Sequence, residues 1–195
     1  MVINFSNTIN VYTLVDAYPT ARVDNILDKV ATNVLFSTID LCSAYHQIPL
    51  HHDDCKYTAF EACGKLFEFT CLPFGCTNAV AIFQRIMDAF IKKYGLKSTY
   101  AYVDDVIIGG TTQAEHDVNL GRYMAAAADY KMQINETKCR FSVTSISYLG
   151  NIVSGGTYRP DPDCFKALLD FPTPTSLKQL NSLISLFAYY TKWVP

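Results

Sequence analysis

The stretch Tyr100-Ala101-Tyr102-Val103-Asp104-Asp105-Val106-Ile107-Ile108 places two adjacent acids between two apolar runs. This pattern is typical of a β-hairpin with the acids at its turn, where aspartate is a common residue. A two-residue turn, however, prefers Asn-Gly or Asp-Gly because it needs a positive φ, and the glycines here come only at Gly109 and Gly110. Paired carboxylates between apolar residues also repel each other unless a cation binds them. The stretch therefore has two interpretations, an ordinary turn or a metal site.

A further acid ends a second apolar run. Asp40 closes the segment Val34-Leu35-Phe36-Ser37-Thr38-Ile39 and precedes Leu41. Taken alone, an acid at the end of a strand is commonly a cap for a helix or turn. Asp40 together with Asp104 would supply carboxylates from two neighbouring strands, which is what two divalent cations need when they hold phosphate oxygens. The joint pattern favours a metal site.

Around these acids, short β-branched and aromatic runs alternate with amphipathic stretches, which indicates a mixed helix and strand architecture. Strands are predicted at 34–38, 57–60, 66–70, 100–103, 106–108 and 146–153. A hairpin turn is predicted at Ala62-Cys63-Gly64. One helix is expected from a cap at Thr77 or Asn78 to Gly95. A second is expected from the capping-box spacing at 112–115 to about 130, and a third after Ser176.

Composition bounds the kind of protein. The chain has 195 residues, of which 50% are hydrophobic and 17% charged, so it is globular and long enough for one domain with a real core. Its net charge of −2 lacks the overall basicity of a typical nucleic-acid binder, so any such partner must be held by a local patch. The seven cysteines show no metal-ligand spacing and are interpreted as reduced thiols. With no secretory or transmembrane segment, we expect an intracellular protein, cytoplasmic or nuclear.

Several segments together resemble a known family. In order and spacing, they are similar to the motifs of reverse transcriptases, and most of all to the Pol polyproteins of gypsy-type LTR retrotransposons. The matching segments are Phe36 to Ile48, Leu72 to Ala79 with Phe83-Gln84, Tyr102-Val103-Asp104-Asp105, Asp16 to Pro19, Lys138 to Phe141, Tyr148-Leu149-Gly150, Phe171 to Pro174 and Tyr189 to Trp193.

The resemblance implies an α+β fold, with reverse-transcriptase fingers and palm, an antiparallel palm sheet with helices packed on one face, and a truncated helical thumb. Residues 1–153 would form partial fingers and palm, and 154–195 the end of the palm and the start of the thumb. The implied activity is an RNA-directed DNA polymerase, a nucleotidyltransferase that adds dNMP from dNTP to a primer 3′-hydroxyl. The alternative is an inactive retroelement remnant, or a nucleic-acid-binding fragment, that keeps the fold. Another palm-fold metal enzyme, such as a nucleotide cyclase, would not explain the segments 72–75 and 148–150.

The resemblance also implies the catalytic residues. Asp40 and Asp104 would bind two Mg²⁺ ions, for which Mn²⁺ could substitute, and Asp105 would be a third acid with a less direct role. The backbone carbonyl of Leu41 would complete a metal shell. Lys138 matches a lysine that protonates pyrophosphate, although a lysine after a helix is usually just solvated.

The same matches imply nucleotide and primer contacts. Tyr45 would exclude a 2′-hydroxyl by packing under the sugar, with Ala44 beside it, although an ordinary buried tyrosine is the alternative. Phe74 and Gly75 would face the nascent base pair, and Gly75 would allow close approach of the backbone. The hairpin at Tyr148, Leu149 and Gly150 would grip the primer.

The resemblance implies as partners a template-primer of RNA or DNA, dNTP, and other segments of a Pol polyprotein such as ribonuclease H and integrase. No membrane partner is expected. The chain departs from the family at Asn4 and Val80, and we expect it to be a piece of a longer polyprotein or a remnant. His46, His51 and His52 show no acid partner at catalytic spacing, so the sequence predicts that they are not ligands.

Overall fold

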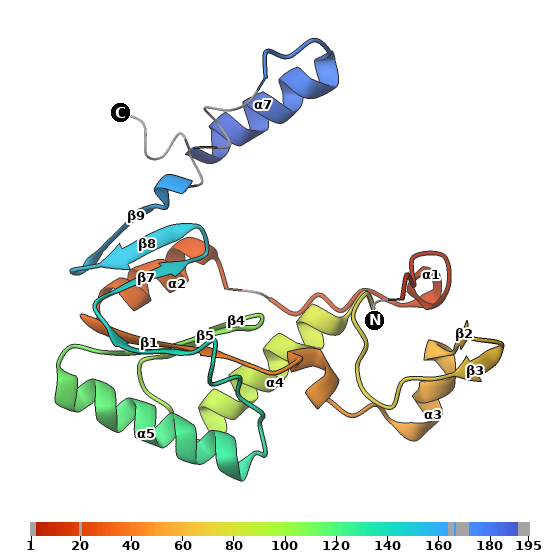
Figure 1. Cartoon of the computed structure of the whole chain (residues 1–195), viewed down its shortest axis with the longest axis horizontal. Helices are drawn as coiled ribbons and strands as arrows, with labels where there is room; N and C mark the ends of the chain where they lie inside the picture. The colour runs from red at the N-terminus through yellow and green to blue at the C-terminus, as the bar shows by residue number, and fades with distance from the viewer. Residues whose placement is uncertain (1–2, 20, 164–165, 167–171, 191–195) are drawn as a thin grey trace.

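The structure is a computed structural model that describes residues 3–19, 21–163, 166 and 172–190. Its centre is a four-stranded sheet in the order β4-β5-β1-β6, in which every neighbouring pair is antiparallel (Figure 1). The strands are β4 (Thr99–Tyr102), β5 (Asp105–Gly110), β1 (Leu35–Asp40) and β6 (Arg140–Val143). The apolar run that ends at Asp40 forms β1, and the one that follows Asp104 forms β5; these two strands lie side by side in the middle of the sheet, where both faces of a strand are covered.

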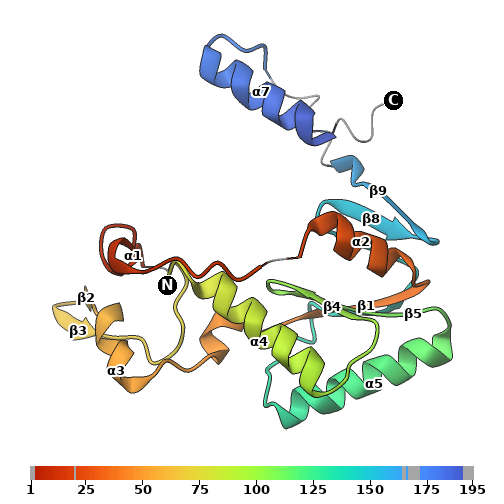
Figure 2. The same cartoon turned by 180° about the vertical axis from the view of Figure 1, so that it is seen from behind.

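Two helices cover one face of this sheet, α4 (Ala79–Lys93) and α5 (Gln113–Asp129) (Figure 2). Both were predicted. The side chain of Thr112 caps α5 by accepting a hydrogen bond from the Glu115 amide at 3.2 Å, as the capping-box spacing indicates. Asn78 occupies the cap position of α4, but its side chain bonds the N-terminal segment instead, donating to the Leu14 carbonyl at 2.8 Å. The buried residues between helices and sheet include Ile39, Phe83, Met87, Phe90, Val106, Ile108 and Tyr123.

The opposite face carries a second layer, which the sequence analysis predicted only in part. It consists of α2 (Val23–Ala31) and a three-stranded sheet of β7 (Ser145–Tyr148), β8 (Asn151–Ser154) and β9 (Thr157–Pro160). The single strand expected over 146–153 is wrong, because the chain turns back at Leu149 and Gly150, both at positive φ (49° and 73°). A second buried cluster joins the layers through Leu27, Val30, Phe36, Ile107, Ile146, Tyr148 and Val153.

A smaller lobe extends from the end of β1. It contains η1 (Ala44–Gln47), α3 (His52–Cys55), η2 (Lys56–Thr58), β2 (Phe60–Ala62) and β3 (Lys65–Phe67), with α1 (Ile9–Tyr12) nearby. The predicted turn at Cys63 and Gly64 is confirmed, and both residues have positive φ (52° and 69°), as a two-residue hairpin requires. The strand expected at 57–60 begins only at residue 60, because the preceding residues form η2.

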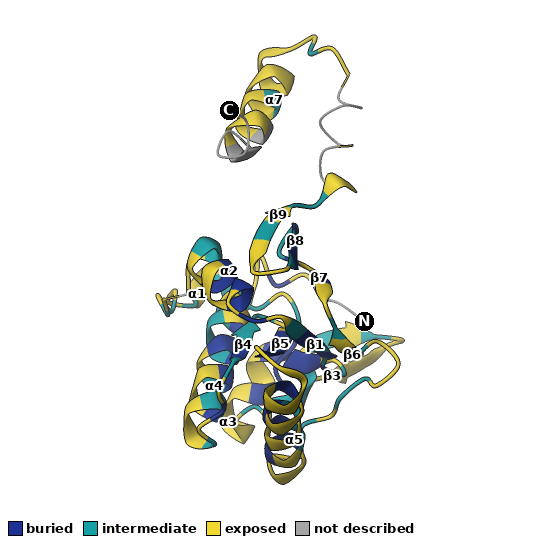
Figure 3. Cartoon of the chain, turned by 90° about the vertical axis from the view of Figure 1, so that its left-hand side faces the viewer, coloured by how far each residue is buried: buried dark blue, intermediate teal, exposed yellow. Residues whose placement is uncertain are grey.

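The last described helix, α7 (Leu177–Tyr190), confirms the helix predicted after Ser176 and is exposed over most of its length (Figure 3). None of the helices in the described part of the chain has the length and apolar character to cross a membrane. The six cysteines described are free thiols. The helices and antiparallel sheets of the described residues confirm the predicted α+β class.

Candidate active site

The sheet brings the acids that the sequence analysis singled out to one end of its central strands. Asp40 is the last residue of β1 and Asp105 is the first of β5, and the antiparallel register pairs them directly. Residues directly opposite in such a pair point to the same face, which here is the face away from α4 and α5. Asp104 lies in the two-residue turn between β4 and β5. Three carboxylates from two segments of the chain thus gather at one end of the sheet.

The carboxylates repel one another, as their pKa values indicate. Partial removal of water raises the pKa of Asp105, and the nearby charge of Asp40 raises it further. The pKa of Asp104 is also raised, first by loss of water and then by the charges of Asp105 and Asp40. All three groups are therefore close enough to interact, and the arrangement favours a bound cation.

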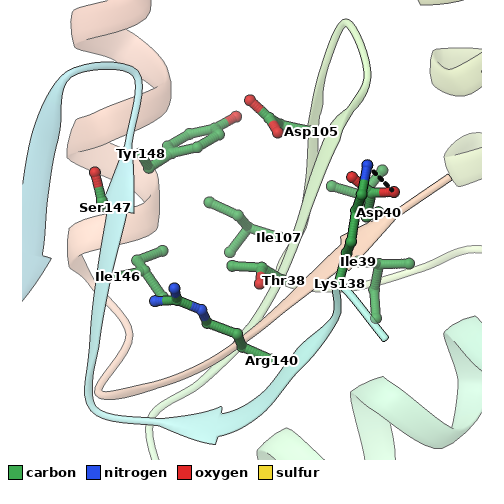
Figure 4. A pocket seen from close by; sticks show the side chains of 11 residues that line it. Thr38, Ile39, Asp40, Asp105, Ile107, Lys138, Arg140, Ile146, Ser147 and Tyr148 are labelled. Atoms are coloured by element: carbon green, nitrogen blue, oxygen red, sulfur yellow. Dashed lines mark ion pairs between the residues drawn. The ribbon is translucent and has the colours of Figure 1, made fainter. Parts of the chain in front are cut away.

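Two basic side chains line the same pocket as Asp40 and Asp105, a cavity of about 200 Å³ (Figure 4). Lys138 Nζ lies 3.9 Å from Asp40 Oδ1, at the outer limit of an ion pair. Arg140, two residues further along the chain, pairs with Thr38 and projects into the pocket. The sequence analysis gave no role to Arg140, which begins β6, whereas Lys138 lies two residues earlier, in the turn before the strand. This pair is a local basic patch in a chain of net charge −2.

The turn that carries Asp104 is held by a residue to which the sequence analysis gave no role. Val103 has φ 52°, a left-handed conformation that costs a β-branched residue free energy. The Gln84 side chain, 5% exposed on α4, accepts a hydrogen bond from the Val103 amide at 2.9 Å. It also donates to the Ala101 carbonyl at 3.1 Å. The glutamine therefore binds the backbone of the hairpin just before the acids.

The predicted nucleotide residues also come together. Tyr45 is 6% exposed, and its ring lies 5.0 Å from the Phe74 ring and 5.4 Å from that of Phe83, measured between centroids. Burial raises the pKa of Tyr45, and the charge of Asp104 adds to the shift, so the tyrosine lies within electrostatic reach of the acids. Ala44 and Leu41 are buried in the same cluster.

The backbone itself requires a glycine at position 75. Its φ is +91°, and a Cβ there would lie 2.9 Å from the Ile3 carbonyl oxygen. What approaches this glycine in the structure is therefore the N-terminal segment, and the close approach expected from the sequence is made by protein backbone.

The hairpin at Tyr148, Leu149 and Gly150 faces the acids from the second layer. Tyr148 is 4% exposed, and its hydroxyl points toward Asp105 in Figure 4. Burial raises the pKa of Tyr148, with a further contribution from Asp105. Within the described residues this hydroxyl has no hydrogen-bond partner. Leu149 and Gly150 form the tip of the hairpin.

Comparison with known proteins fits this geometry. Residues 5–153 match the family described as reverse transcriptase (RNA-dependent DNA polymerase). The chain belongs to this family. It is 36% identical over 194 residues to the retrovirus-related Pol polyprotein from transposon gypsy and 34% identical to that from transposon opus, both of Drosophila melanogaster. Each match covers 100% of this chain and 19% of the relative, so the chain spans about a fifth of their length.

Solved reverse transcriptases share the fold. A foamy viral protease-reverse transcriptase in complex with double-stranded DNA superposes with a TM-score of 0.89 at 23% identity, covering 97% of this chain and 33% of the other. The same viral protein in complex with an RNA/DNA hybrid gives a TM-score of 0.83 at 22% identity, covering 97% and 25%. The fold predicted from the sequence, that of a reverse transcriptase, is thereby confirmed.

The donor set of this chain fits Mg²⁺. Carboxylate and carbonyl oxygens are the ligands this hard cation takes. The carboxylates come from Asp40, Asp104 and Asp105. Backbone hydrogen bonds lie on both sides of Leu41. The Asn135 amide donates to the Asp40 carbonyl (2.9 Å), and the Cys42 amide donates to the Gln133 carbonyl (3.0 Å). These two bonds form an isolated antiparallel bridge between Leu41 and Ile134. In such a bridge the carbonyl of Leu41 itself points away from Ile134 and takes no part in the pairing.

Repulsion between the acids predicts a pH-dependent stability in the absence of metal. Because the folded pKa values of Asp104 and Asp105 are raised, protonation favours the folded state. The favourable contribution is present below the unfolded pKa, about 3.9, and is lost as the pH rises through the folded value. In EDTA at pH 7, Asp105→Asn is expected to raise Tm by up to about 2–4 °C, since solvent screening limits the gain to about 1 kcal/mol.

Thermal unfolding of both proteins at several pH values checks this expectation. The difference in Tm between Asp105→Asn and the parent should shrink as the pH falls from 7 toward about 4, where the parent carboxyl is itself protonated. A difference that grows on acidification would contradict the assigned repulsion.

Proposed function

We propose that this chain carries the polymerase centre of an RNA-directed DNA polymerase, which transfers dNMP from dNTP to a primer 3′-hydroxyl on an RNA or DNA template. The observation that carries the proposal is the meeting of Asp40, Asp104 and Asp105 at one end of the sheet in a chain of the reverse transcriptase family. Separate segments supply these carboxylates, and their mutual repulsion opposes folding unless a cation binds them.

Asp40 and Asp104 are the residues that would hold two Mg²⁺ ions, with Asp105 and the Leu41 carbonyl completing the shell. The chemistry that bound Mg²⁺ supplies is a lowered pKa for the primer hydroxyl and neutralisation of the triphosphate and leaving pyrophosphate. Lys138 would donate a proton to the pyrophosphate. Its distance of 3.9 Å from Asp40 supports this role, because so long a contact leaves the ammonium free to turn toward another anion.

Tyr45 would select the sugar of the incoming nucleotide. The Phe74 and Phe83 rings hold the tyrosine in place, so it cannot move aside to admit a 2′-hydroxyl. Ala44 would line the same pocket, and Phe74 and Gly75 would lie against the nascent base pair.

The expected consequence is that Tyr45→Val lets ribonucleotides compete with dNTPs. A ribonucleotide excluded only by a steric clash of a few kcal/mol should gain about 10- to 100-fold in relative incorporation when the ring is removed. Single-nucleotide insertion with matched dNTP and rNTP measures this ratio. Phe60→Val provides a matched control at an aromatic residue of the β2–β3 hairpin, and unchanged discrimination in Tyr45→Val would remove Tyr45 from the sugar pocket.

The partners we propose are a template-primer and dNTP. The hairpin of Tyr148, Leu149 and Gly150 would hold the primer end beside the acids, and Arg140 would meet its phosphates. Solved relatives in complex with double-stranded DNA and with an RNA/DNA hybrid support a nucleic-acid partner. Residues 1–153 would supply partial fingers and palm and 154–195 the start of the thumb. Ribonuclease H and integrase segments of a Pol polyprotein would be further partners.

Extension of a primed RNA template in Mg²⁺ by the purified chain tests the proposal. Metal-dependent incorporation that EDTA abolishes supports a polymerase. Template-primer binding without incorporation, in both Mg²⁺ and Mn²⁺, would instead support the alternative, a remnant that keeps the fold and binds nucleic acid.

A further inference from the structure

A cluster of possible metal ligands lies at the start of α3, in the smaller lobe. His51, His52 and Asp53 each offer one ligand atom, and these atoms all lie within 4.8 Å of one another. His52 Nε2 is 2.9 Å from Asp53 Oδ1, and His51 Nδ1 is 3.6 Å from Asp53 Oδ2. The sequence analysis expected no acid partner for these histidines. The structure corrects that expectation, because the first turn of α3 brings the Asp53 carboxylate into contact with both imidazoles.

The donor atoms are open to solvent, and their contacts lie within the cluster. The two histidine side chains are 65% and 83% exposed, and that of Asp53 is 67% exposed. His51 Nδ1 accepts a hydrogen bond from the Asp53 amide at 3.4 Å, which is long for such a bond. An ion can therefore reach the cluster from water, and on binding it would replace the direct contact between His52 and Asp53.

The chemistry of the cluster points to a transition metal. Imidazole nitrogen together with one carboxylate suits Zn²⁺, and three protein ligands with a water in the fourth position form a common tetrahedral arrangement. Because the three ligand atoms lie within 4.8 Å of one another, one point lies no more than about 2.8 Å from each of them, and Zn²⁺ ligands lie at about 2.0–2.2 Å. Side-chain rotations that move each donor atom by less than about 1 Å would close that gap.

We propose that His51, His52 and Asp53 form a binding site for a divalent transition-metal ion of the Zn²⁺ class, separate from the catalytic acids. The two sites differ in their donors. Asp40, Asp104 and Asp105 offer only oxygen, which suits Mg²⁺, whereas the α3 site offers two imidazoles, which Mg²⁺ binds poorly. Zn²⁺ should therefore bind at α3 even when excess Mg²⁺ fills the catalytic site.

The position of the site suggests what the ion would hold. His51 precedes α3, whose last residue, Cys55, accepts a hydrogen bond from the Thr58 hydroxyl at 2.6 Å. The same hydroxyl accepts from the Phe69 amide at 2.9 Å, just beyond β3. An ion at His51, His52 and Asp53 would fix the first turn of α3 and, through Thr58, the base of the β2–β3 hairpin.

Calorimetric titration of the whole chain with ZnCl₂, in excess MgCl₂, tests the proposal. We expect one equivalent to bind and to raise Tm. His52→Gln and Asp53→Asn should each weaken Zn²⁺ binding at least about tenfold, as loss of a ligand does. Asp54→Asn is the matched control, because Asp54 is the neighbouring exposed acid outside the cluster, and it should bind Zn²⁺ within about twofold of the parent.

A thiol site is the competing explanation, since Cys63 is exposed. Binding that survives in Cys63→Ser supports the α3 site, and binding that disappears there overturns the proposal. Equal losses in Asp53→Asn and Asp54→Asn, or unchanged affinity in His52→Gln, would also overturn it. Circular dichroism of each variant shows whether it is folded. Because Zn²⁺ affinity is measured without substrate, the result does not depend on polymerase activity.

Discussion

Replacing Asp104 by asparagine is expected to abolish Mg²⁺-dependent primer extension, with a loss of about 10³-fold or more. The substitution keeps the size of the side chain and removes the charge that would hold the metals. Asp40→Asn should have an effect of the same order, because the two carboxylates would share the ions. Steady-state incorporation of a single dNTP on a primed RNA template measures both losses.

The fold provides a control for this prediction. Asp54→Asn removes an exposed acid from α3, away from the sheet, and should leave extension within about twofold. In EDTA, Asp104→Asn should be at least as stable as the parent, since the lost charge is one that Asp105 and Asp40 repel. Full extension by a folded Asp104→Asn variant would show that these acids are not the catalytic centre, and the proposed function would fail with it.

The parts of this structure that could be predicted from sequence depend on neighbouring residues. The β4–β5 hairpin follows from two apolar runs around a pair of acids, and α5 from a Thr112 cap with Glu115 three residues later. The turn at Cys63 and Gly64 follows from local backbone preference. In each case the residues that determine the element lie within a few positions of one another.

The parts that could not be predicted depend on residues brought together by the whole fold. The sequence analysis did not predict β6 or β9, because each has only four residues and its burial comes from distant partners. It also missed α2, although the buried residues Ile26, Leu27, Val30 and Ala31 follow helical spacing. The close approach at Gly75 is made by the carbonyl of Ile3, about seventy positions away in the chain. The turn expected to need glycine takes Val103 instead, in a strained conformation that a tertiary contact stabilises.

That tertiary contact identifies Gln84 as a positioning residue for the acids. Its side chain is 5% exposed and makes three hydrogen bonds, to the Val103 amide, the Ala101 carbonyl and Asp88 Oδ1 (3.0 Å). The first two belong to the hairpin that carries Asp104. Without the glutamine, Val103 would lose the hydrogen bond of its amide while still at φ 52°, and the turn would be free to relax.

Gln84→Leu is therefore expected to lower the rate of extension by about 10- to 100-fold, which corresponds to about 1–3 kcal/mol for a buried amide left without its partner. Gln113→Leu on the exposed start of α5 is the matched control and should change the rate by less than about threefold. Gln84→Glu separates the two roles of the side chain. It keeps the oxygen that accepts from Val103 but loses the donor to Ala101 and places a second charge beside Asp88. If the Val103 contact is what positions Asp104, Gln84→Glu should lose stability in thermal unfolding yet retain more activity than Gln84→Leu. If both variants lose activity only in proportion to their loss of stability, Gln84 supports the fold and does not position the acids.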